Sequence, residues 1–327
     1  MLRILLTEPL DADAEARLAA GAALVRPAAG SGPPAEAALC DLVADCDGLV
    51  MRTSARVTRA VLAAGRRLRV VGVAGVGTDC VDVAAARELG IAVLNTPGAA
   101  TEAVADLTVA LMLQLLRPIP RLAEAYRRGQ FAAARAAPHG RELAECTIGI
   151  IGMGRIGTAV ARRCAAGFGA RVLYNDIVSV GPFEFADPGV LLAPADKATI
   201  WRGCDIISLH VPLTDPGPAI PPAHATRRLI DADVLGQFRP GAFLINTARG
   251  GVIDTAALSA ALGASPAGRL GGAALDVTDP EPLPADHPLF KCERCILTPH
   301  VAARTHHGLR RMYAVVDDVL AFLAGAR

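Results

Sequence analysis

Short runs of four or five apolar residues alternate with amphipathic stretches along the whole chain. The runs are rich in Val, Leu and Ile, as buried strands are, and the stretches between them repeat apolar residues at helical spacing. In the first part of the chain this pattern predicts strands at residues 2–6, 48–51, 69–73 and 92–94. Such βα alternation is typical of a parallel sheet covered by helices.

The same alternation resumes beyond a long apolar helix predicted at residues 101–117. It predicts a final helix at 305–324 and six strands, at 147–151, 171–175, 206–210, 242–246, 272–276 and 295–297. Six strands with intervening helices match a complete doubly wound sheet. The predicted fold class is therefore α/β, with two doubly wound parallel sheets.

Length and charge narrow the class of protein. A chain of 327 residues suggests two domains. A formal net charge of +1 without a basic block argues against nucleic acid and anionic membranes as partners. The longest apolar stretch, residues 109–116, is too short to span a bilayer. The N-terminus lacks a signal-peptide pattern, so we expect a cytoplasmic protein.

The eight cysteines are scattered through apolar segments, as buried free thiols usually are. Cys292 and Cys295 form a CxxC, but a zinc site would want a second pair or histidines at ligand spacing. The sequence therefore predicts reduced thiols and no metal.

A glycine motif stands where the second series of strands begins. The strand at 147–151 runs into Gly152-x-Gly154-x-x-Gly157 and then into a helical pattern. This order is the dinucleotide-binding fingerprint: Gly152 permits the tight turn, Gly154 lets a pyrophosphate approach the backbone, and Gly157 lets the helix pack on its strand. The N–H groups of the helix N-terminus would bind the phosphates.

Asp176 ends the next predicted strand, about twenty residues beyond the motif. An acid at this place accepts the ribose hydroxyls of NAD and repels the 2′-phosphate of NADP. No arginine follows closely to compensate. The sequence therefore predicts NAD as the cofactor.

Chemically capable residues follow the later strands. Arg249, Asp276, Glu281 and His300 all lie beyond carboxyl ends, where open α/β sheets bind ligands. Reduction of a 2-keto acid needs a bidentate cation for the carboxylate (Arg249), a proton donor for the carbonyl oxygen (His300) and a carboxylate that stabilises imidazolium (Glu281). We assign Asp276 to the nicotinamide carboxamide.

One segment interrupts the alternation of strands and helices. Residues 214–226 contain four prolines and a glycine, which prevent both helix and sheet. One interpretation is surface decoration. The other is that residues 215–225 pack over the rim of the crevice or against a dimer partner.

Seven ordered motifs give the chain a specific resemblance. They are the segment 72–82, Asn95-Thr-Pro-Gly98 with Glu102 to Asp106, the glycine fingerprint, and the segments 208–214, 246–251, 275–282 and 298–300. With them the chain resembles the D-isomer-specific 2-hydroxyacid dehydrogenases, of the phosphoglycerate dehydrogenase and glyoxylate/hydroxypyruvate reductase type.

The resemblance implies two Rossmann-like or flavodoxin-like domains with the active-site cleft between them. Residues 1–98 and 302–327 would bind substrate, residues 99–301 would bind NAD, and the cofactor domain would form a homodimer. It implies an Arg249–Glu281–His300 triad, and backbone amides of Val76 and Gly77 on the substrate carboxylate with Arg52 nearby. It places Arg155 and Ile156 at the pyrophosphate, and Val211, Pro212 and Thr247 on the nicotinamide ribose side. His210 is expected among the cofactor-binding residues as well.

Departures from the relatives favour a small substrate. Val73 stands where phosphoglycerate dehydrogenases often carry an arginine, and formate dehydrogenases have glutamine in place of Glu281. The run from Glu281 to Leu289 looks most like glyoxylate/hydroxypyruvate reductases. Two alternatives stay open: a phosphoglycerate dehydrogenase-like enzyme, and an NAD-sensing binding protein similar to the C-terminal-binding-protein co-repressors.

Overall fold

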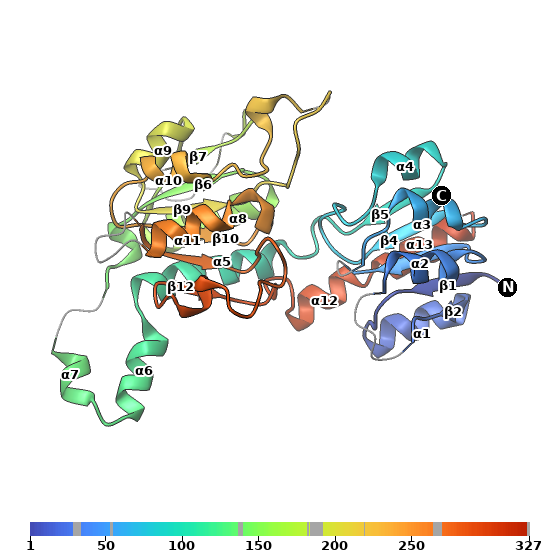
Figure 1. The fold of residues 1–327 in the computed structure, drawn as a ribbon, viewed down its shortest axis with the longest axis horizontal. Helices are drawn as coiled ribbons and strands as arrows, with labels where there is room; N and C mark the ends of the chain where they lie inside the picture. The colour runs from blue at the N-terminus through green and yellow to red at the C-terminus, as the bar shows by residue number, and fades with distance from the viewer. Residues whose placement is uncertain are drawn as a thin grey trace. The chain divides into compact units, whose positions relative to one another are not determined.

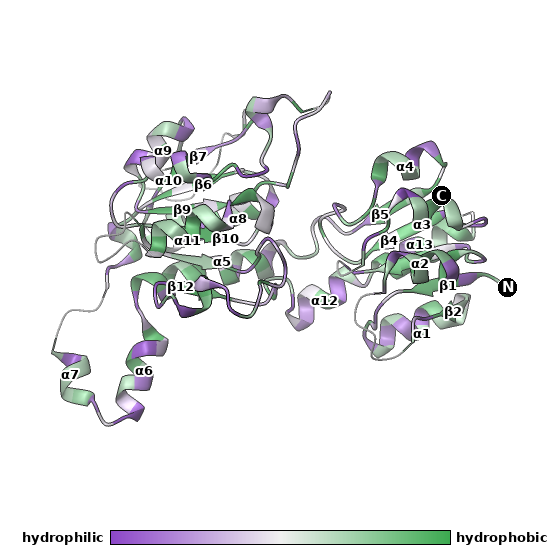
Figure 2. Ribbon diagram, viewed as in Figure 1, coloured by the Kyte–Doolittle hydropathy of each residue, from purple (hydrophilic) through white to green (hydrophobic). Residues whose placement is uncertain are grey.

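The computed structural model describes residues 1–28, 34–52, 55–136, 140–181, 183, 192–218, 220–263 and 270–325. The chain divides into two compact units, Met1–Ala100 with Ala303–Arg327, and Thr101–Ala302. Each unit is a parallel sheet covered by helices, which confirms the predicted fold class (Figure 1). Apolar residues concentrate on the strands of both units (Figure 2).

The first unit has a five-stranded sheet in the order β2-β1-β3-β4-β5. One face packs on α2, α3 and α4, and the other receives α13. A Cβ on Gly72 would lie 2.5 Å from Val319, so β4 can approach α13 closely only because this strand position has no side chain. The elements are β1 (Arg3–Leu6), α1 (Ala12–Gly21), β2 (Ala23–Val25), α2 (Glu36–Val43), β3 (Gly48–Met51), α3 (Arg59–Ala64), β4 (Val70–Val73), α4 (Val83–Glu88), β5 (Ala92–Asn95), α12 (His306–Met312) and α13 (Val315–Leu323).

The C-terminal helix predicted at 305–324 is two helices, so that prediction was wrong. The break falls at Tyr313 and Ala314, where i→i−3 hydrogen bonds replace the helical pattern. No glycine or proline marks the place. Beyond it α13 buries Val315, Val316 and Val319, so packing on the sheet sets the break.

The second unit has a seven-stranded sheet in the order β12-β11-β10-β9-β6-β7-β8. Helices α9, α10 and α11 cover one face, and α5 and α8 cover the other. The elements are α5 (Thr101–Leu116), β6 (Thr147–Ile151), α8 (Arg155–Arg162), β7 (Arg171–Asn175), β8 (Leu192–Pro194), α9 (Lys197–Gly203), β9 (Ile206–Leu209), α10 (Ala232–Gln237), β10 (Ala242–Asn246), α11 (Thr255–Gly263), β11 (Leu270–Leu275) and β12 (Cys295–Leu297). The edge strands β2 and β8, three residues each, escaped the sequence pattern.

An arm of two helices, α6 (Ile119–Arg127) and α7 (Phe131–Arg135), leaves the second unit between α5 and β6 (Figure 1). Neither helix buries a residue. No single described helix is long and apolar enough to cross a membrane, and α5 and α6 meet that criterion only as a pair bent by 58°.

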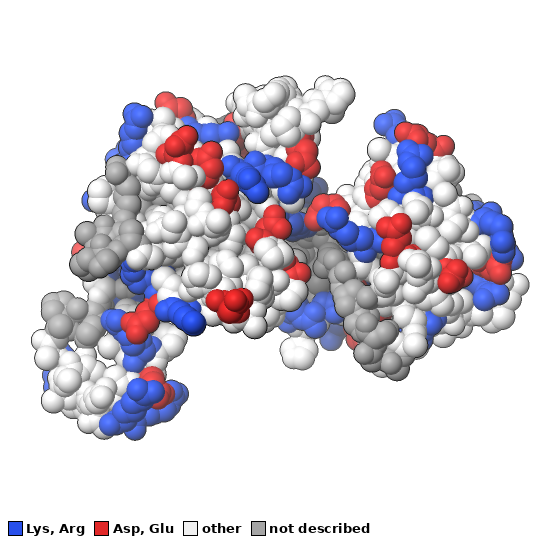
Figure 3. Space-filling view, in the orientation of Figure 1, with Lys and Arg blue, Asp and Glu red and all other residues white. Residues whose placement is uncertain are grey.

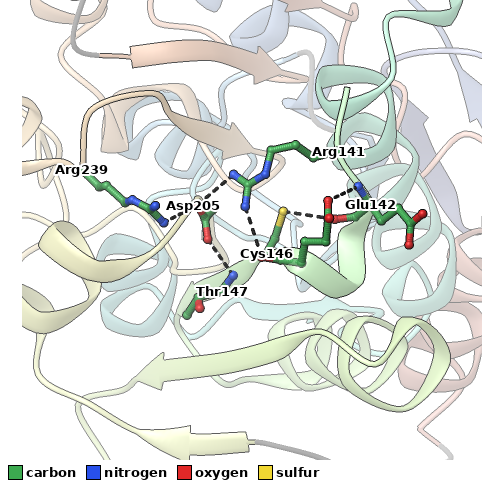
Figure 4. A network of polar contacts seen from close by, with 7 residues as sticks. Arg141, Glu142, Cys146, Thr147, Asp205 and Arg239 are labelled. Carbon is green, nitrogen blue, oxygen red and sulfur yellow. Dashed lines mark hydrogen bonds and ion pairs between the residues drawn. The ribbon is translucent and has the colours of Figure 1, made fainter. Parts of the chain in front are cut away.

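Asp205 ties the amino ends of β6 and β9 together. Its carboxylate accepts hydrogen bonds from Arg141 (2.9 Å), from the backbone N–H of Thr147 (2.9 Å) and from Arg239. The two arginines reach it from opposite sides (Figure 4). Burial raises the pKa of Asp205, but these hydrogen bonds and both positive charges outweigh burial and lower it. The buried carboxylate therefore stays ionised and braces the sheet at the end away from the glycine turn.

Candidate active site

The residues that follow the strands of the second sheet form one row. The strand registers are continuous, so the positions just past the carboxyl ends are neighbours. In sheet order they are Thr298, Asp276, Thr247, His210, Gly152 and Asp176. Neighbouring strands lie about 4.8 Å apart, so the row extends over roughly 24 Å. It crosses β9 and β6, where the strand order reverses and such sheets bind ligands.

The turn after β6 fits a bound dinucleotide. Gly152 has a φ of +93°, and a Cβ there would lie 2.5 Å from the carbonyl oxygen of His210. A Cβ on Gly154 would meet nothing within 4 Å, so the backbone is open to a ligand on that side. The first intrahelical bond of α8 is from Thr158 N–H to the Gly154 carbonyl, which leaves the N–H groups of Arg155 and Ile156 free of helical partners. These donors suit a pyrophosphate.

A pocket of about 250 Å³ lies beside this turn. Its wall includes Gly152 and Gly154, then Asp176 from the end of β7, and His210, Val211 and Pro212 from the end of β9. The structure thus brings six of the predicted cofactor residues to one cavity. Arg155 and Ile156 belong to the adjoining first turn of α8.

The carboxylate of Asp176 also organises the turn. Its Oδ2 accepts from the backbone N–H of Met153 at 2.6 Å, and its Oδ1 accepts from that of Val178 at 3.1 Å. Each carboxylate oxygen has a second acceptor position. Asp176 can therefore fix the glycine turn and still accept from ribose hydroxyls.

His210 is a half-buried base in this row. Burial lowers the pKa of His210 to about 3. Its Nε2 lies 2.9 Å from Oγ of Ser208, while its Nδ1 is buried without a partner among the described residues. A polar ring atom left over in a pocket wall is a further feature that fits a polar ligand.

The proline-rich segment contributes to the same pocket. Thr214 and Thr226 close its base: each backbone N–H donates to the other's hydroxyl, at 2.8 and 3.2 Å. Between them Ile220, Pro221 and His224 line the cavity. Ala219 lies outside the described residues.

His300 and Glu281 meet at the other end of the row. Nδ1 of His300 lies 2.7 Å from Oε1 of Glu281, and both side chains are partly exposed. Burial raises the pKa of Glu281, but the hydrogen bond and charge of His300, the N–H of Thr278 and the charge of Arg249 lower it below its usual range. The Arg249 guanidinium donates from Nη1 to the carbonyl of Ala248 at 2.8 Å. The structure therefore places all three residues of the expected triad in one neighbourhood.

Asp276 has other partners than the nicotinamide carboxamide to which the sequence assigned it. The carboxylate is buried and accepts from the Thr298 hydroxyl (2.6 Å) and from the N–H groups of Val301 (2.9 Å) and Ala302 (2.8 Å). These bonds bracket His300, which has a φ of +52°, rare for a residue other than glycine. Asp276 thus holds the backbone that presents the histidine.

The remaining predicted site residues are Thr247 in the second unit and the expected substrate-binding residues in the first. The Thr247 hydroxyl is buried 2.8 Å from the hydroxyl of Thr108 on α5. In the first unit, Arg52 follows β3 and its guanidinium lies 3.9 Å from Glu8. Val76 and Gly77 follow β4, and the Val76 carbonyl accepts from Asn95 at 2.6 Å. The binding roles of Arg52, Val76 and Gly77 stay predictions.

No group of His, Cys, Asp or Glu side chains within the described ranges could hold a metal ion. Burial raises the pKa of Cys295 in the CxxC to about 12, which disfavours a thiolate ligand.

Sequence reasoning missed Lys197, which stands at the start of α9 and lines the pocket. Lys197 lies 21 residues beyond Asp176 and belongs to no recognisable motif. Only the pairing of β8 with β7 brings it near the pocket.

Fold, glycine turn and pocket define a nicotinamide-dinucleotide-dependent dehydrogenase. Residues 109–302 match the family described as D-isomer specific 2-hydroxyacid dehydrogenase, NAD binding domain. A glyoxylate reductase of Korarchaeum cryptofilum is 38% identical over 90% of this chain and 84% of its own length. A hydroxypyruvate reductase of Thermotoga maritima is 35% identical over 84% and 83%.

The chain is also similar in structure to a solved reductase of the same kind. The NADPH-dependent glyoxylate/hydroxypyruvate reductase of Sinorhizobium meliloti, in complex with NADP and malonate, is 31% identical and superposes with a TM-score of 0.81 over 98% of this chain and 93% of its own. The chain belongs to the D-isomer-specific 2-hydroxyacid dehydrogenase family. It is an NAD-binding oxidoreductase that acts on CH–OH donors.

Proposed function

We propose that the chain reduces a small 2-keto acid of the glyoxylate or hydroxypyruvate type to its D-2-hydroxy acid with NADH. The contact of 2.7 Å between His300 and Glu281 is the observation that carries this proposal. It lies at the carboxyl edge of the sheet that also carries the glycine turn and Asp176. The glyoxylate and hydroxypyruvate reductases among the relatives support the choice of substrate.

His300 is the proposed proton donor. NADH, when bound, supplies the hydride that reduces the carbonyl carbon. Nδ1 of His300 is held by Glu281, and Nε2 has no hydrogen bond to any described residue. Nε2–H is thus the group that can give its proton to the carbonyl oxygen, and the carboxylate of Glu281 stabilises the imidazolium before transfer.

Arg249 is the proposed ligand of the substrate carboxylate. A guanidinium offers two parallel N–H donors that match a carboxylate, which a lysine cannot do. We further propose that the backbone amides of Val76 and Gly77, with Arg52 nearby, bind the same carboxylate.

A substrate screen tests the function. NADH oxidation is followed with glyoxylate, hydroxypyruvate, 3-phosphohydroxypyruvate and pyruvate, with His300→Gln as the control. We expect the highest kcat/KM with glyoxylate or hydroxypyruvate. A preference for the phosphorylated acid would instead indicate a phosphoglycerate dehydrogenase-like enzyme. Tight NADH binding without turnover of any 2-keto acid would indicate a binding protein.

We also propose a homodimer in which the α6–α7 arm packs on a second copy of the chain. Ile119, Tyr126 and Phe131 are 59%, 66% and 53% exposed, and the arm buries no residue in its own chain. Basic side chains gather on the surface that α6 forms (Figure 3). Sedimentation should give a dimer for the native chain and a monomer for Tyr126→Asp with Phe131→Asp. A native monomer at micromolar concentration would contradict this.

We infer a cytoplasmic location, since all eight cysteines are free. Fractionation of cells that carry the native gene tests it: activity outside the cytoplasm would be the contrary result.

A further inference from the structure

Lys197 is a cation in the wall of the pocket that contains Asp176. The chain has only two lysines, Lys197 and Lys291, among 33 basic residues. Lys197 is half-buried and forms no ion pair or hydrogen bond with any side chain in the described ranges. A half-buried lysine without a counter-charge among the described residues is available to an anionic ligand.

Backbone contacts fix this cation relative to the acid. The N–H of Ala195 donates to the Tyr174 carbonyl, and the Asn175 side chain donates to the Ala195 carbonyl, each at 2.8 Å. Asp176 directly follows Asn175, and Lys197 is two residues beyond Ala195. The side chain of Asp196 caps α9 through the N–H of Thr199 at 2.6 Å. The chain segments that carry the two charges are therefore held together by the edge of the sheet.

Asp176 and Lys197 form no ion pair with each other. The Asp176 carboxylate accepts only from backbone N–H groups of Met153 and Val178 among the described residues. A phosphate on the 2′-oxygen of an adenosine held by Asp176 would meet one negative charge from Asp176 and one positive charge from Lys197. Opposite charges in a partly desolvated pocket attract more strongly than in bulk water.

We propose that Lys197 is a selectivity residue that offsets Asp176 toward an adenosine 2′-phosphate, so that the pocket accepts NADP(H) as well as NAD(H). This rests on the proposed function only in placing the adenosine in the pocket. It modifies the expectation of strict NAD use, because the compensating cation comes from α9 and not from the residues that follow Asp176. The solved S. meliloti relative in complex with NADP shows that a chain of this fold can hold that nucleotide.

Binding of two nucleotides that differ only in the 2′-phosphate tests the proposal. Adenosine 5′-monophosphate and adenosine 2′,5′-bisphosphate are titrated into the full-length native chain and its variants by calorimetry. We expect Lys197→Ala to weaken the bisphosphate about five-fold, the effect of one partly exposed charge pair, and to change the monophosphate less than two-fold. Lys197→Arg should retain the bisphosphate, and Asp176→Ser should strengthen it.

Lysine acetylation read by mass spectrometry gives a second measurement that needs no turnover. At equal saturation the bisphosphate should protect Lys197 more than the monophosphate does, while Lys291 should react equally in both. Raised salt should reduce this difference, since the interaction is one of exposed charges. His224→Asn is the matched control, because His224 lines the same pocket from the proline-rich segment.

Two results would overturn the role of Lys197. One is an equal loss of affinity for both nucleotides in Lys197→Ala, which would show that the lysine lines the pocket without recognising the 2′-phosphate. The other is an unchanged bisphosphate affinity. Failure of the native chain to bind either nucleotide would be a different result, because it would contradict the cofactor pocket of the proposed function.

Discussion

Nδ1 of His300 lies 2.7 Å from Oε1 of Glu281, although the two residues are 19 positions apart. β11 and β12 pair in parallel, and the segments beyond their carboxyl ends carry Glu281 and His300. The partial exposure of both side chains leaves the pair open to a substrate from solvent. A histidine held in this way can exchange a proton at its other nitrogen, which is what reduction of a carbonyl requires.

Replacement of Glu281 by Gln should move the pH profile. The hydrogen bond and charge of His300 hold the pKa of Glu281 below its usual range, and the neutral amide of Gln cannot replace that negative charge. Its loss should therefore move the basic limb of keto-acid reduction to lower pH. The pH dependence of kcat/KM with NADH measures this. His300→Gln is the reference and should lower kcat by roughly 10²–10⁴ with nucleotide affinity retained. A basic limb that stays in place would mean that another group supplies the proton.

Replacement of Arg249 by Lys keeps the charge but loses the two-pronged donor. We expect KM for the keto acid to rise and kcat/KM to fall by about 10-fold or more, because one charge-assisted hydrogen bond is lost. Steady-state kinetics with saturating NADH measures it. Near-native kcat/KM in this variant would remove Arg249 from the carboxylate site.

Replacement of Asp276 by Asn should act through the position of His300. An amide cannot accept from all three of its present donors, so at least one buried N–H or O–H loses its partner, at about 1–3 kcal/mol. A misplacement of the histidine by about 1 Å can cost roughly 10²-fold in rate. We expect lower kcat, an unchanged basic limb and unchanged nucleotide affinity.

Thr298→Val is the matched control for that experiment. It removes one donor and leaves both backbone bonds of Asp276 intact. Its loss of kcat should therefore be smaller. Weaker nucleotide binding in Asp276→Asn would instead support the contact with the nicotinamide carboxamide that the sequence suggested for Asp276.

The sequence predicted the row of residues at the strand ends because one register governs all of them. Once the strands are located, Asp176, Gly152, His210 and Asp276 must share an edge. The partners of Asp276 and the place of Lys197 could not be predicted in this way. Both depend on the course of loops that fold back onto the sheet. The spacing of apolar residues in the sequence carries no information about that course. The break in the last helix could not be predicted either, because packing of α13 on the sheet sets it and no glycine or proline marks it.

Acidification should destabilise the fold through His210. Burial lowers the pKa of His210 to about 3, whereas an unfolded histidine titrates near ~6.5. The unfolded state therefore binds more protons below about pH 6.5, and the free energy of unfolding falls as pH drops toward the folded value. Its slope is up to ~1.4 kcal/mol per pH unit for one proton. Asp205 acts in the same direction but at lower pH, near the range of carboxylates.

Urea unfolding between pH 7 and pH 5 isolates the histidine from the carboxylates. We expect the free energy of unfolding of His210→Gln to depend less steeply on pH than that of the native chain in this range. The absolute stability of the variant does not enter the comparison. Identical slopes would show that His210 is protonated in the folded protein.

Shortening the proline-rich segment should weaken nucleotide binding. Ile220 and Pro221 line the pocket, and Thr214 and Thr226 already close the base of the segment. A two-residue turn in place of residues 215–225 can therefore join the same two threonines. We expect the affinity for adenosine 5′-monophosphate to fall several-fold, because apolar wall is lost from the cavity. The prolines restrict the unfolded chain, so thermal stability should change little or fall slightly. Unchanged nucleotide affinity and unchanged oligomeric mass in a folded variant would show that the segment is surface decoration. A loss of dimer mass with affinity retained would instead place it at the subunit contact.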